Sequence, residues 1–302
     1  MSIVIPTHNR FEKLTRLLDS IERSSFNTDE REIIVVLDNC SDGTFEKLKS
    51  RNDAIKLIKA PHVGPDQIFG ANGSRALGAE LARAPFLCFI DDDNIIDSDM
   101  LGTLVGALEQ NENLGAVGPL MLRWPERSGI WCSGAEVTKL GRSKIRNDAR
   151  LGTDGANSNA LTKCDFIPNV FCTRKSILRA VPFDPLLFPH NNSEVDWGFR
   201  LQDVGYEIAI SMQARDWHDI GYKSWTTRVS SSAFVRDHAR SRIILRRKYE
   251  DRFWPRSFFW LLWFPLSSAY YLGRFARSGQ GRRLCAGYLK GTVEGWRRAR
   301  EM

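Results

Sequence analysis

Short apolar runs alternate with longer amphipathic segments over the first hundred residues of the chain. In residues 14–21, leucine and isoleucine recur at positions i, i+3, i+4 and i+7, which is one face of a helix. Runs of four or five apolar residues are typical of strands covered on both faces of a parallel sheet. The alternation therefore predicts βαβ units in an α/β fold with a mostly parallel sheet. The expected strands are residues 2–5, 33–37, 55–58 and 86–90, and the expected helices are residues 14–21, 44–48 and 74–81.

The second half of the chain has a less regular pattern. A helix is expected at residues 101–108, and strands are expected at residues 115–121 and 207–210. Residues 123–163 are rich in glycine, serine, asparagine and basic residues and have little periodicity, so we expect loops and a hairpin there. An irregular stretch of that length inside a compact domain is usually functional or mobile.

Three acids follow the apolar run at residues 86–90: Asp91, Asp92 and Asp93. The carboxyl ends of strands are where open α/β sheets bind their ligands. Adjacent carboxylates repel one another unless a cation or hydrogen-bond donors offset their charge, and oxygen ligands suit Mg²⁺ or Mn²⁺ that bridges to a phosphate. The alternative is a solvated acidic turn that caps the next helix, since residues 97–99 also suit an N-cap.

Charge is unevenly distributed over the 302 residues, whose formal net charge is +7. Residues 236–302 hold 16 Lys and Arg against 5 Asp and Glu, whereas residues 1–235 hold 27 against 31. This asymmetry indicates an anionic partner for the C-terminal tail alone. Six cysteines without a C-x-x-C pair favour reduced thiols in a cytosolic protein over a disulfide framework or a zinc site. The first strand begins almost at Met1, so we expect no signal peptide and a cytoplasmic protein.

The tail combines aromatic and basic residues. Seventeen uncharged residues lie between Arg256 and Arg274, interrupted by Pro265, which is short for a membrane span. Aromatic side chains prefer the lipid interface, and flanking arginines would meet anionic headgroups. For residues 254–302 we expect a kinked helix or helical hairpin in the plane of the cytoplasmic leaflet, as in a peripheral protein. A span by residues 257–273 and a soluble helical subdomain or dimer contact are the alternatives.

Four segments, in this order, resemble the family 2 inverting glycosyltransferases of the GT-A fold: residues 3–10, residues 35–44, the segment with Arg75 and Gly78, and the acids at 91–93. The resemblance extends over residues 2–248. It implies a GT-A domain at residues 1–250, with a nucleotide-sugar-binding half at 1–97 and an acceptor and catalytic half at 98–250. Residues 251–302 would then be a helical, membrane-associating appendage. It also implies a nucleotide-diphosphate sugar, with UDP- or dTDP-sugars favoured, and Mn²⁺ or Mg²⁺.

The resemblance also implies roles for individual residues. Asp38 would bind the nucleotide base (a structural turn acid is the alternative), Asp92 would contact the ribose, and Asp93 would bind the cation together with His218. The full set of residues implied to bind the donor is Pro6, Thr7, Asn9, Arg10, Asp38, Arg75, Asp91 and Asp92. For Asp91, holding loop backbone is an equally open alternative.

Residues 191–201 are similar to the catalytic segment of the family. Glu194 is the candidate general base, which a carboxylate can be if its site desolvates it. Ser193 stands where many members have a second acid, so Asp196 stays open as the base; alternatively, both acids merely complement a helix dipole. Trp124, Trp131 and Trp197 are candidates to stack on acceptor sugars, with core packing as the alternative. Residues 234–242 are similar to an arginine-bearing helix in members that use rhamnose or galactofuranose donors, whose arginines would reach the diphosphate or face anionic lipid.

We therefore expect a metal-dependent inverting glycosyltransferase that moves a hexosyl or deoxyhexosyl group to a hydroxyl of a glycan or lipid-linked acceptor, in cell-surface polysaccharide or glycolipid synthesis. A sugar nucleotidylyltransferase is one alternative, but residues 6–9 are not a glycine-rich phosphate loop. A non-enzymatic membrane scaffold with a degenerate transferase fold is the other. Nucleic acid is not an expected partner, because arginine mixed with apolar residues suits lipid better.

Overall fold

The computed structural model describes residues 1–51, 55–61, 69–126, 129–147, 160–220, 231–253, 255 and 258–302. The chain divides into two compact units. The first comprises Met1–Glu136, Ile145–Pro189 and Ser193–Ile220, and the second comprises Val137–Lys144, His190–Asn192 and Gly221–Met302. The functional boundary that we expect near residue 250 stays a prediction.

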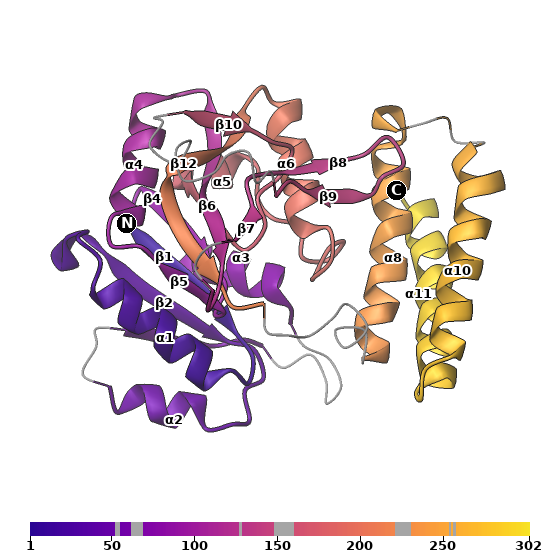
Figure 1. Cartoon of the computed structure of the whole chain (residues 1–302), viewed down its shortest axis with the longest axis horizontal. Coiled ribbons are helices and arrows are strands. Elements are labelled where there is room, and N and C mark those ends of the chain that lie inside the picture. The colour runs from indigo at the N-terminus through magenta and orange to yellow at the C-terminus, as the bar shows by residue number, and fades with distance from the viewer. Residues whose placement is uncertain are drawn as a thin grey trace. The chain divides into compact units, whose positions relative to one another are not determined.

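One large sheet forms the centre of the first unit (Figure 1). Its main path runs in the order β10-β12-β6-β11-β4-β1-β2-β3, with β5 paired to β12 and β7 paired to β6. The strands are β1 (Ser2–Thr7), β2 (Glu32–Leu37), β3 (Ile55–Lys59), β4 (Phe86–Ile90), β5 (Asn94–Ile96), β6 (Leu114–Arg123), β7 (Ile130–Cys132), β10 (Leu161–Lys163), β11 (Val170–Arg174) and β12 (Glu207–His218), while β8 (Ala135–Val137) pairs with β9 (Ser143–Ile145) in a small second sheet.

The sheet is parallel where the sequence predicts βαβ units. β1 pairs in parallel with both β2 and β4, and β2 pairs in parallel with β3. β11 lies antiparallel to β4 and to β6, while β6 and β12 are parallel to each other. The carboxyl ends of β1, β2, β4, β6 and β12 therefore meet at one edge of the sheet. The predicted α/β fold with a mostly parallel sheet is confirmed.

Helices cover both faces of this sheet. In the first unit they are α1 (Phe11–Glu22), α2 (Thr44–Lys49), α3 (Ala71–Leu81), α4 (Met100–Gln110), α5 (Lys175–Ala180) and α6 (Ser193–Asp203). α3 packs closely on β1 and β2, because a Cβ atom on Gly78 would lie 2.3 Å from Val4 Cγ1. A glycine at this position lets the helix bring Arg75, one turn earlier, down to the sheet.

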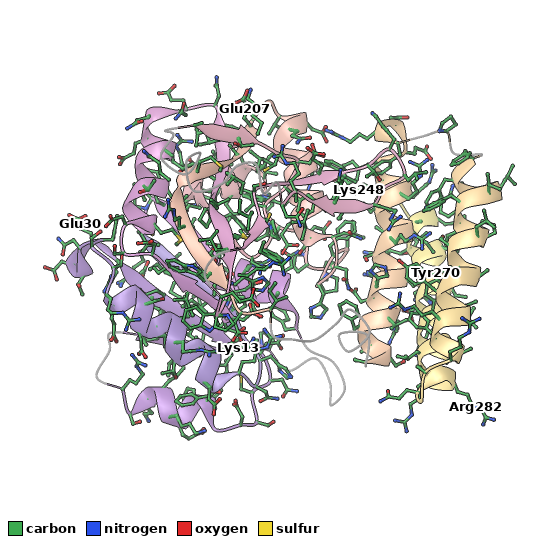
Figure 2. The ribbon with its side chains drawn as sticks, viewed as in Figure 1. Lys13, Glu30, Glu207, Lys248, Tyr270 and Arg282 are labelled. Atoms are coloured by element: carbon green, nitrogen blue, oxygen red, sulfur yellow. The ribbon has the colours of Figure 1, made fainter. Side chains whose placement is uncertain are left out.

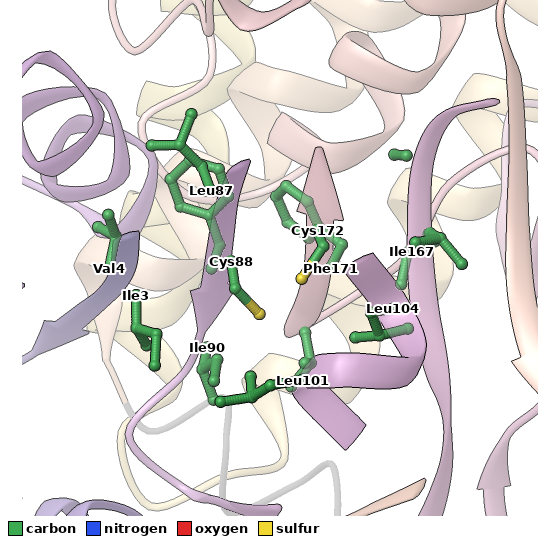
Figure 3. Close-up of a cluster of buried hydrophobic side chains, with 14 of the residues drawn as sticks. Ile3, Val4, Leu87, Cys88, Ile90, Leu101, Leu104, Ile167, Phe171 and Cys172 are labelled. Atoms are coloured by element: carbon green, nitrogen blue, oxygen red, sulfur yellow. The ribbon is translucent and has the colours of Figure 1, made fainter. Parts of the chain in front are cut away.

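Successive buried side chains of the central strands point to opposite faces of the sheet, as the pleat requires. Figure 3 shows Ile3, Cys88 and Ile90 on the side of α4, where Leu101 and Leu104 pack, and Leu87 on the opposite side. All six of these residues are completely buried. β4 is thus covered on both faces, which is why its sequence is uniformly apolar.

Two strands depart from the expected pattern. β5 follows the three acids directly, where the sequence suggested only a turn and a helix cap; Asp99, the N-cap of α4, makes no side-chain capping bond. β12 continues past the expected residues 207–210 to His218, with a register shift between Ser211 and Arg215 against β6. Its last residues pair with β5, so His218 lies opposite Asn94. Of the irregular stretch at 123–163, residues 127–128 and 148–159 lie outside the described residues.

The second unit contains α8 (Ser232–Lys248), η4 (Glu250–Arg252), η5 (Phe259–Trp263), α10 (Phe264–Ala276) and α11 (Gly281–Arg300). η5 is a π-helical turn immediately before Pro265, which cannot donate a backbone hydrogen bond. A helical hairpin in the tail agrees with one of the two forms expected for it. None of the helices in the described part of the chain has the length and apolarity that a membrane span needs.

Candidate active site

The three acids after β4 have distinct surroundings. Asp92 is buried; its Oδ2 accepts a hydrogen bond from Thr7 Oγ1 at 2.7 Å, and its Oδ1 accepts one from Arg10 Nη1 at 2.9 Å. Burial raises the pKa of Asp92 to about 6, although Arg10 opposes this. The end of β1 and the loop after it are therefore joined to the end of β4, as expected for neighbouring parallel strands. The acids are not a solvated turn.

Arg75 lies between two other carboxylates. Its guanidinium is completely buried and donates to Asp91 Oδ1 and to Glu194 Oε1, each at 2.6 Å. The guanidinium also lies over the Phe171 ring, 5.7 Å from its centroid. Arg75 links the strand that carries the acids to the helix that carries the candidate base. The Asp91 side chain is 24% exposed, and Arg75 engages its Oδ1. Donor-binding roles for Arg75 and Asp91 remain predictions.

Asp93 and His218 form the second half of the site. His218 Nε2 lies 3.5 Å from Asp93 Oδ1 and 2.9 Å from Asn169 Nδ2, and the edge of the Trp131 ring packs against the imidazole. Burial opposes ionisation of Asp93, but His218, Arg10 and Lys13 outweigh it and lower its pKa to about 2. The expected pair of Asp93 and His218 is brought together.

This pair fits a divalent cation in chemistry and in number. An ionised carboxylate beside an imidazole nitrogen is a donor set that Mn²⁺ accepts. Among the described residues no group of three or more His, Cys, Asp or Glu side chains could hold a metal ion by itself. Asp93 and His218 would be the two residues to hold such a cation.

Glu194 and Asp196 differ in exposure. The Asp196 side chain is 1% exposed and accepts a hydrogen bond from Arg200 Nε at 2.9 Å, within the same helix. The Glu194 side chain is 21% exposed, and its Oε2 accepts a hydrogen bond from Ser193 Oγ at 2.8 Å. Burial would raise the pKa of Glu194, but the Arg75 guanidinium and the hydrogen bonds outweigh it and leave the pKa below its ordinary value. Glu194 is therefore ionised at neutral pH and partly accessible, whereas Asp196 is part of the core of α6.

Asp38, at the end of β2, is engaged with the loop before α3. Its two carboxylate oxygens accept hydrogen bonds from the backbone N–H groups of Phe69 and Gly70, at 2.8 and 2.7 Å. The Asp38 side chain is buried, which agrees with the turn-acid alternative. A contact with a nucleotide base remains a prediction.

The remaining candidates fall into two groups. Pro6 is buried within β1, while Asn9 is exposed and its Oδ1 accepts a hydrogen bond from Ser41 N at 2.7 Å. Trp124 and Trp131 are both partly exposed and adjacent to His218: Trp124 N donates to His218 O at 3.1 Å. Trp197 is buried against Phe171 and Phe183, and its Nε1 donates to Val181 O. The acceptor role expected for Trp197 is wrong, because no face of its ring is left for a sugar.

Several residues of the site escaped the sequence reasoning. Asn169 contacts His218 from the loop before β11, and its carbonyl accepts a hydrogen bond from Asp91 N at 3.2 Å. The Pro168-Asn169 pair was the available signal, because such dipeptides mark turns. Lys13, on α1 (Figure 2), lies 4.0 Å from Asp93 Oδ2 and donates to Asp219 O at 2.7 Å. Its amphipathic helix gave no reason to separate it from other surface lysines.

Asp216 is a further acid that sequence reasoning passed over. It lies on the same face of β12 as His218, two residues away, and is completely buried. Neither of its carboxylate oxygens has a hydrogen-bond partner among the described residues. Burial, and secondarily the charge of Asp93, raises the pKa of Asp216 well above its ordinary value.

The family model "Glycosyl transferase family 2" matches residues 2–171, more than half of the chain. The chain belongs to glycosyl transferase family 2. The matched segment contains β1, β2, β4, Arg75 and the three acids at 91–93, and it ends within β11, before Glu194 and His218.

Two curated members of the family illustrate the range of relatives. A GalNAc(5)-diNAcBac-PP-undecaprenol β-1,3-glucosyltransferase of Campylobacter jejuni is 33% identical over 108 residues, which is 35% of this chain and 33% of that protein. An abequosyltransferase of Salmonella typhimurium is 29% identical over 188 residues, 59% of this chain and 52% of that protein. The aligned regions thus span a third to a half of the length of these relatives.

Solved structures share the fold at low sequence identity. The crystal structure of GalNAc-T7 with UDP, GalNAc and Mn²⁺ aligns with a TM-score of 0.65 and 13% identity, over 99% of this chain and 55% of that one. The structure of S. aureus TarS 1-349 with UDP-GlcNAc aligns with a TM-score of 0.53 and 16% identity, over 98% and 91%. The fold is therefore GT-A-like.

Proposed function

We propose that this family 2 member is an inverting glycosyltransferase that moves a sugar from a nucleotide-diphosphate donor to an acceptor hydroxyl. The observation that carries the proposal is the linkage of one candidate base and one candidate cation site around the end of β4. Arg75 links Glu194 to Asp91. Asp93, two residues after Asp91 in the same loop, is paired with His218. A carboxylate base and a cation-binding acid that are both connected to this loop suit direct displacement of a diphosphate.

Glu194 is the proposed general base. Its Oε1 is fixed by Arg75 and its Oε2 by Ser193, so the carboxylate has a defined orientation and is ionised before substrate arrives. It would take the proton of an acceptor hydroxyl while that oxygen attacks the anomeric carbon and the bond from that carbon to the diphosphate breaks. Attack opposite to the leaving group inverts the anomeric centre. Asp196 stays paired with Arg200 within α6.

Asp93 and His218 would hold a divalent cation, Mn²⁺ or Mg²⁺. When bound, such a cation supplies positive charge that stabilises the leaving diphosphate. Thr7 and Arg10 hold the Asp92 carboxylate in place, where we propose that it receives the donor ribose. Asp38 would contact the base of a UDP- or dTDP-nucleotide through lone pairs that Phe69 and Gly70 leave free. A UDP donor is consistent with the nucleotides named for the two solved structures.

The acceptor is proposed to be a glycan or a lipid-linked saccharide, in cell-surface polysaccharide or glycolipid synthesis. Trp124 and Trp131 offer ring surface beside His218 for a sugar. The name of the Campylobacter relative, with its undecaprenol-linked substrate, supports a lipid-linked acceptor. We place the protein at the cytoplasmic face of a membrane as a peripheral enzyme. A rhamnosyl or galactofuranosyl donor remains a prediction from the resemblance of residues 234–242.

The test is a donor panel of UDP-, GDP- and dTDP-sugars, each incubated with the full chain with and without Mn²⁺. Release of a nucleoside diphosphate should depend on one class of donor. Glu194→Gln should lower that rate at least about a hundredfold, the size expected for loss of a general base. Asp196→Asn is the matched control and should retain binding of donor and cation, because its carboxylate lies in the helix core.

Near-normal turnover by Glu194→Gln would refute the assigned base. In a parallel incubation with a nucleoside triphosphate and a sugar 1-phosphate, release of inorganic diphosphate with formation of a sugar nucleotide would instead identify a nucleotidylyltransferase. Failure of the whole panel, with no donor bound in equilibrium dialysis, would favour a protein that has kept the fold and lost the activity.

A further inference from the structure

The strongest unexplained feature outside the candidate site is an exposed apolar surface on the hairpin of η5, α10 and α11. We propose that the exposed face of η5 and α10 rests on an anionic lipid bilayer, with the helix axis parallel to the membrane plane. This inference extends the proposed membrane location by naming the surface that binds lipid, and it does not depend on glycosyl transfer.

The exposed positions of η5 and α10 follow one helical stripe. Apart from Ala276 at the end of α10, they are Leu261, Leu262, Pro265, Leu266, Ala269, Tyr270 and Gly273. The side chains at 261, 266 and 270 are 79%, 59% and 60% exposed, respectively. No charged residue interrupts the stripe, whereas the outward face of a helix in water is normally polar. We call these seven residues the α10 apolar face.

The opposite side of η5 and α10 packs against α11 of the same unit. Phe259 and Phe275 are buried, Ser268 Oγ lies 2.9 Å from Tyr288 Oη of α11, and Trp260 packs on Trp296 at 4.2 Å between ring centroids. The helix is therefore already docked on its own unit through one face. The α10 apolar face is a second, separate surface that nothing among the described residues covers.

The charge of the residues near the α10 apolar face indicates what binds to it. No acid occurs between Asp251 and Glu294, while arginines and a lysine occur at 274, 277, 282, 283 and 290. Arg277, Arg282 and Arg283 are exposed in the turn after α10 and the start of α11, and Arg282 projects from that end of the hairpin (Figure 2). An apolar stripe that ends in a cluster of cations complements acyl chains beneath anionic headgroups.

A second copy of the chain fits this surface less well. In a symmetric dimer through the α10 apolar face, the arginine clusters would add like charge at the rim, with no acid between residues 252 and 293 to offset it. A bilayer supplies the negative charge that the chain lacks. At the rim of this surface the tail has arginines, where a dimer would need acids.

The experiment is co-sedimentation of the full chain with vesicles of phosphatidylcholine alone and of phosphatidylcholine mixed with phosphatidylglycerol. The anionic vesicles should bind at least about tenfold more protein than the neutral ones, and added salt should reduce the difference. The double variant Leu261→Glu and Leu266→Glu should lose at least about tenfold of this binding.

Val204→Glu is the matched control. Its side chain is 59% exposed, it lies in the first unit, and the substitution adds the same charge as each single substitution of the double variant, at an apolar surface position. It should bind vesicles like the wild type, and far-UV circular dichroism should show that both variant proteins retain their helices. Equal vesicle binding by the double variant would overturn the proposal. So would a wild-type dimer in sedimentation equilibrium that the double variant dissociates, together with absence of vesicle binding, because that result identifies a second copy as the occupant.

Discussion

Asparagine holds the backbone in a left-handed conformation at four positions in the described residues. These are Asn9, Asn39, Asn169 and Asn192, with φ between 51° and 64°. Asparagine tolerates this region better than other side chains with a Cβ. Three of the four residues lie in loops after β1, after β2 and before β11, which border the candidate site. Local strain of this kind concentrates where a loop must present specific groups, and Asn169 itself contacts His218 and the backbone of Asp91.

At the same scale, Arg75 is the side chain with the largest influence on the pKa of Glu194, and it opposes the effect of burial. We predict that Arg75→Lys lowers kcat/KM at least about tenfold and moves the acid limb of its pH profile to higher pH. A lysine ammonium cannot donate to Asp91 and Glu194 in the same geometry, so Glu194 loses part of the interaction that lowers its pKa. The proton must leave Glu194 before it can act as a base, and a higher pKa therefore removes activity first at low pH. The measurement is kcat/KM against pH.

Ser193→Ala is the companion variant for this prediction. It removes one hydrogen bond to Glu194 Oε2 and leaves the guanidinium in place, so its shift of the acid limb should have the same direction and a smaller size. A lower kcat/KM with an unmoved acid limb in Arg75→Lys would mean that Arg75 only stabilises the fold.

At the scale of elements, the second unit depends on close contact between α8 and α11. The two helices run in parallel, with Gly287, Gly291 and Gly295 of α11 against the carbonyls of Ser232, Arg236 and Arg240. Spacing of four residues places all three glycines on one face, as in tightly packed helix pairs. Arg236 also forms an ion pair with Glu294 at 2.5 Å. The arginines of residues 234–242 are thus engaged within this unit at Arg236, and Arg242 lies against aromatic rings of η5 and α10.

We predict that Gly291→Ala destabilises the second unit by about 2 kcal/mol. A Cβ at this position would lie 2.0 Å from the Arg236 carbonyl oxygen, so the helices must separate, and overpacking of this kind costs about 1–3 kcal/mol. Gly273→Ala is the control, because nothing lies within 4 Å of its Cβ position. That change should stabilise α10 by about 0.5–1 kcal/mol. Urea unfolding followed by circular dichroism measures both, and equal effects would show that the glycine contact is loose.

Sequence periodicity identified the elements of the first unit because local pattern and burial agree there. β1, β2, β3, β4 and α1 lie where the apolar runs place them. β5 and the continuation of β12 were not predicted, since they exist only by pairing with each other and with β6. The residues of β12 from Gln213 to Asp216 mix charge with apolar positions, and a register shift hides their period. His218 was expected beside Asp93 from the resemblance alone, and the strand that delivers it was not.

The sequence predicted residues of the candidate site but not the contacts between their side chains. Arg75 and Glu194 are 119 positions apart in the chain, so no local pattern indicates that one neutralises the other. The donor-binding role expected for Arg75 followed from its motif, whereas its burial depends on the approach of Gly78 to Val4. Trp197 shows the same limit, because an aromatic residue in a catalytic segment suits a sugar platform or a core equally well until its neighbours are known.

At the scale of the whole molecule, the two units differ in charge and in their response to acid. The first unit keeps its ionised groups in pairs, such as Arg75 with Asp91 and Glu194. The second unit buries a neutral histidine, His238 of α8. Burial, and then the charge of Arg242, lowers the pKa of His238 to about 4, and only Asp237 opposes this. The rings of Phe234 and Tyr271 lie 6.4 and 5.9 Å from the imidazole, and its Nε2 has no hydrogen-bond partner among the described residues.

We predict that the second unit loses up to about 3 kcal/mol of stability between pH 6.5 and pH 4, through His238 alone. In this window the unfolded chain binds a proton at His238 and the folded protein does not, so the unfolded state gains stability as pH falls. Above pH 6.5 both states are neutral at this position, and the contribution no longer changes. The variant His238→Phe keeps a ring between Phe234 and Tyr271 and cannot be protonated. Its free energy of unfolding, from urea titrations at successive pH values, should therefore fall less steeply with acid than that of the wild type, and parallel curves would mean that the folded protein accommodates the charged imidazole.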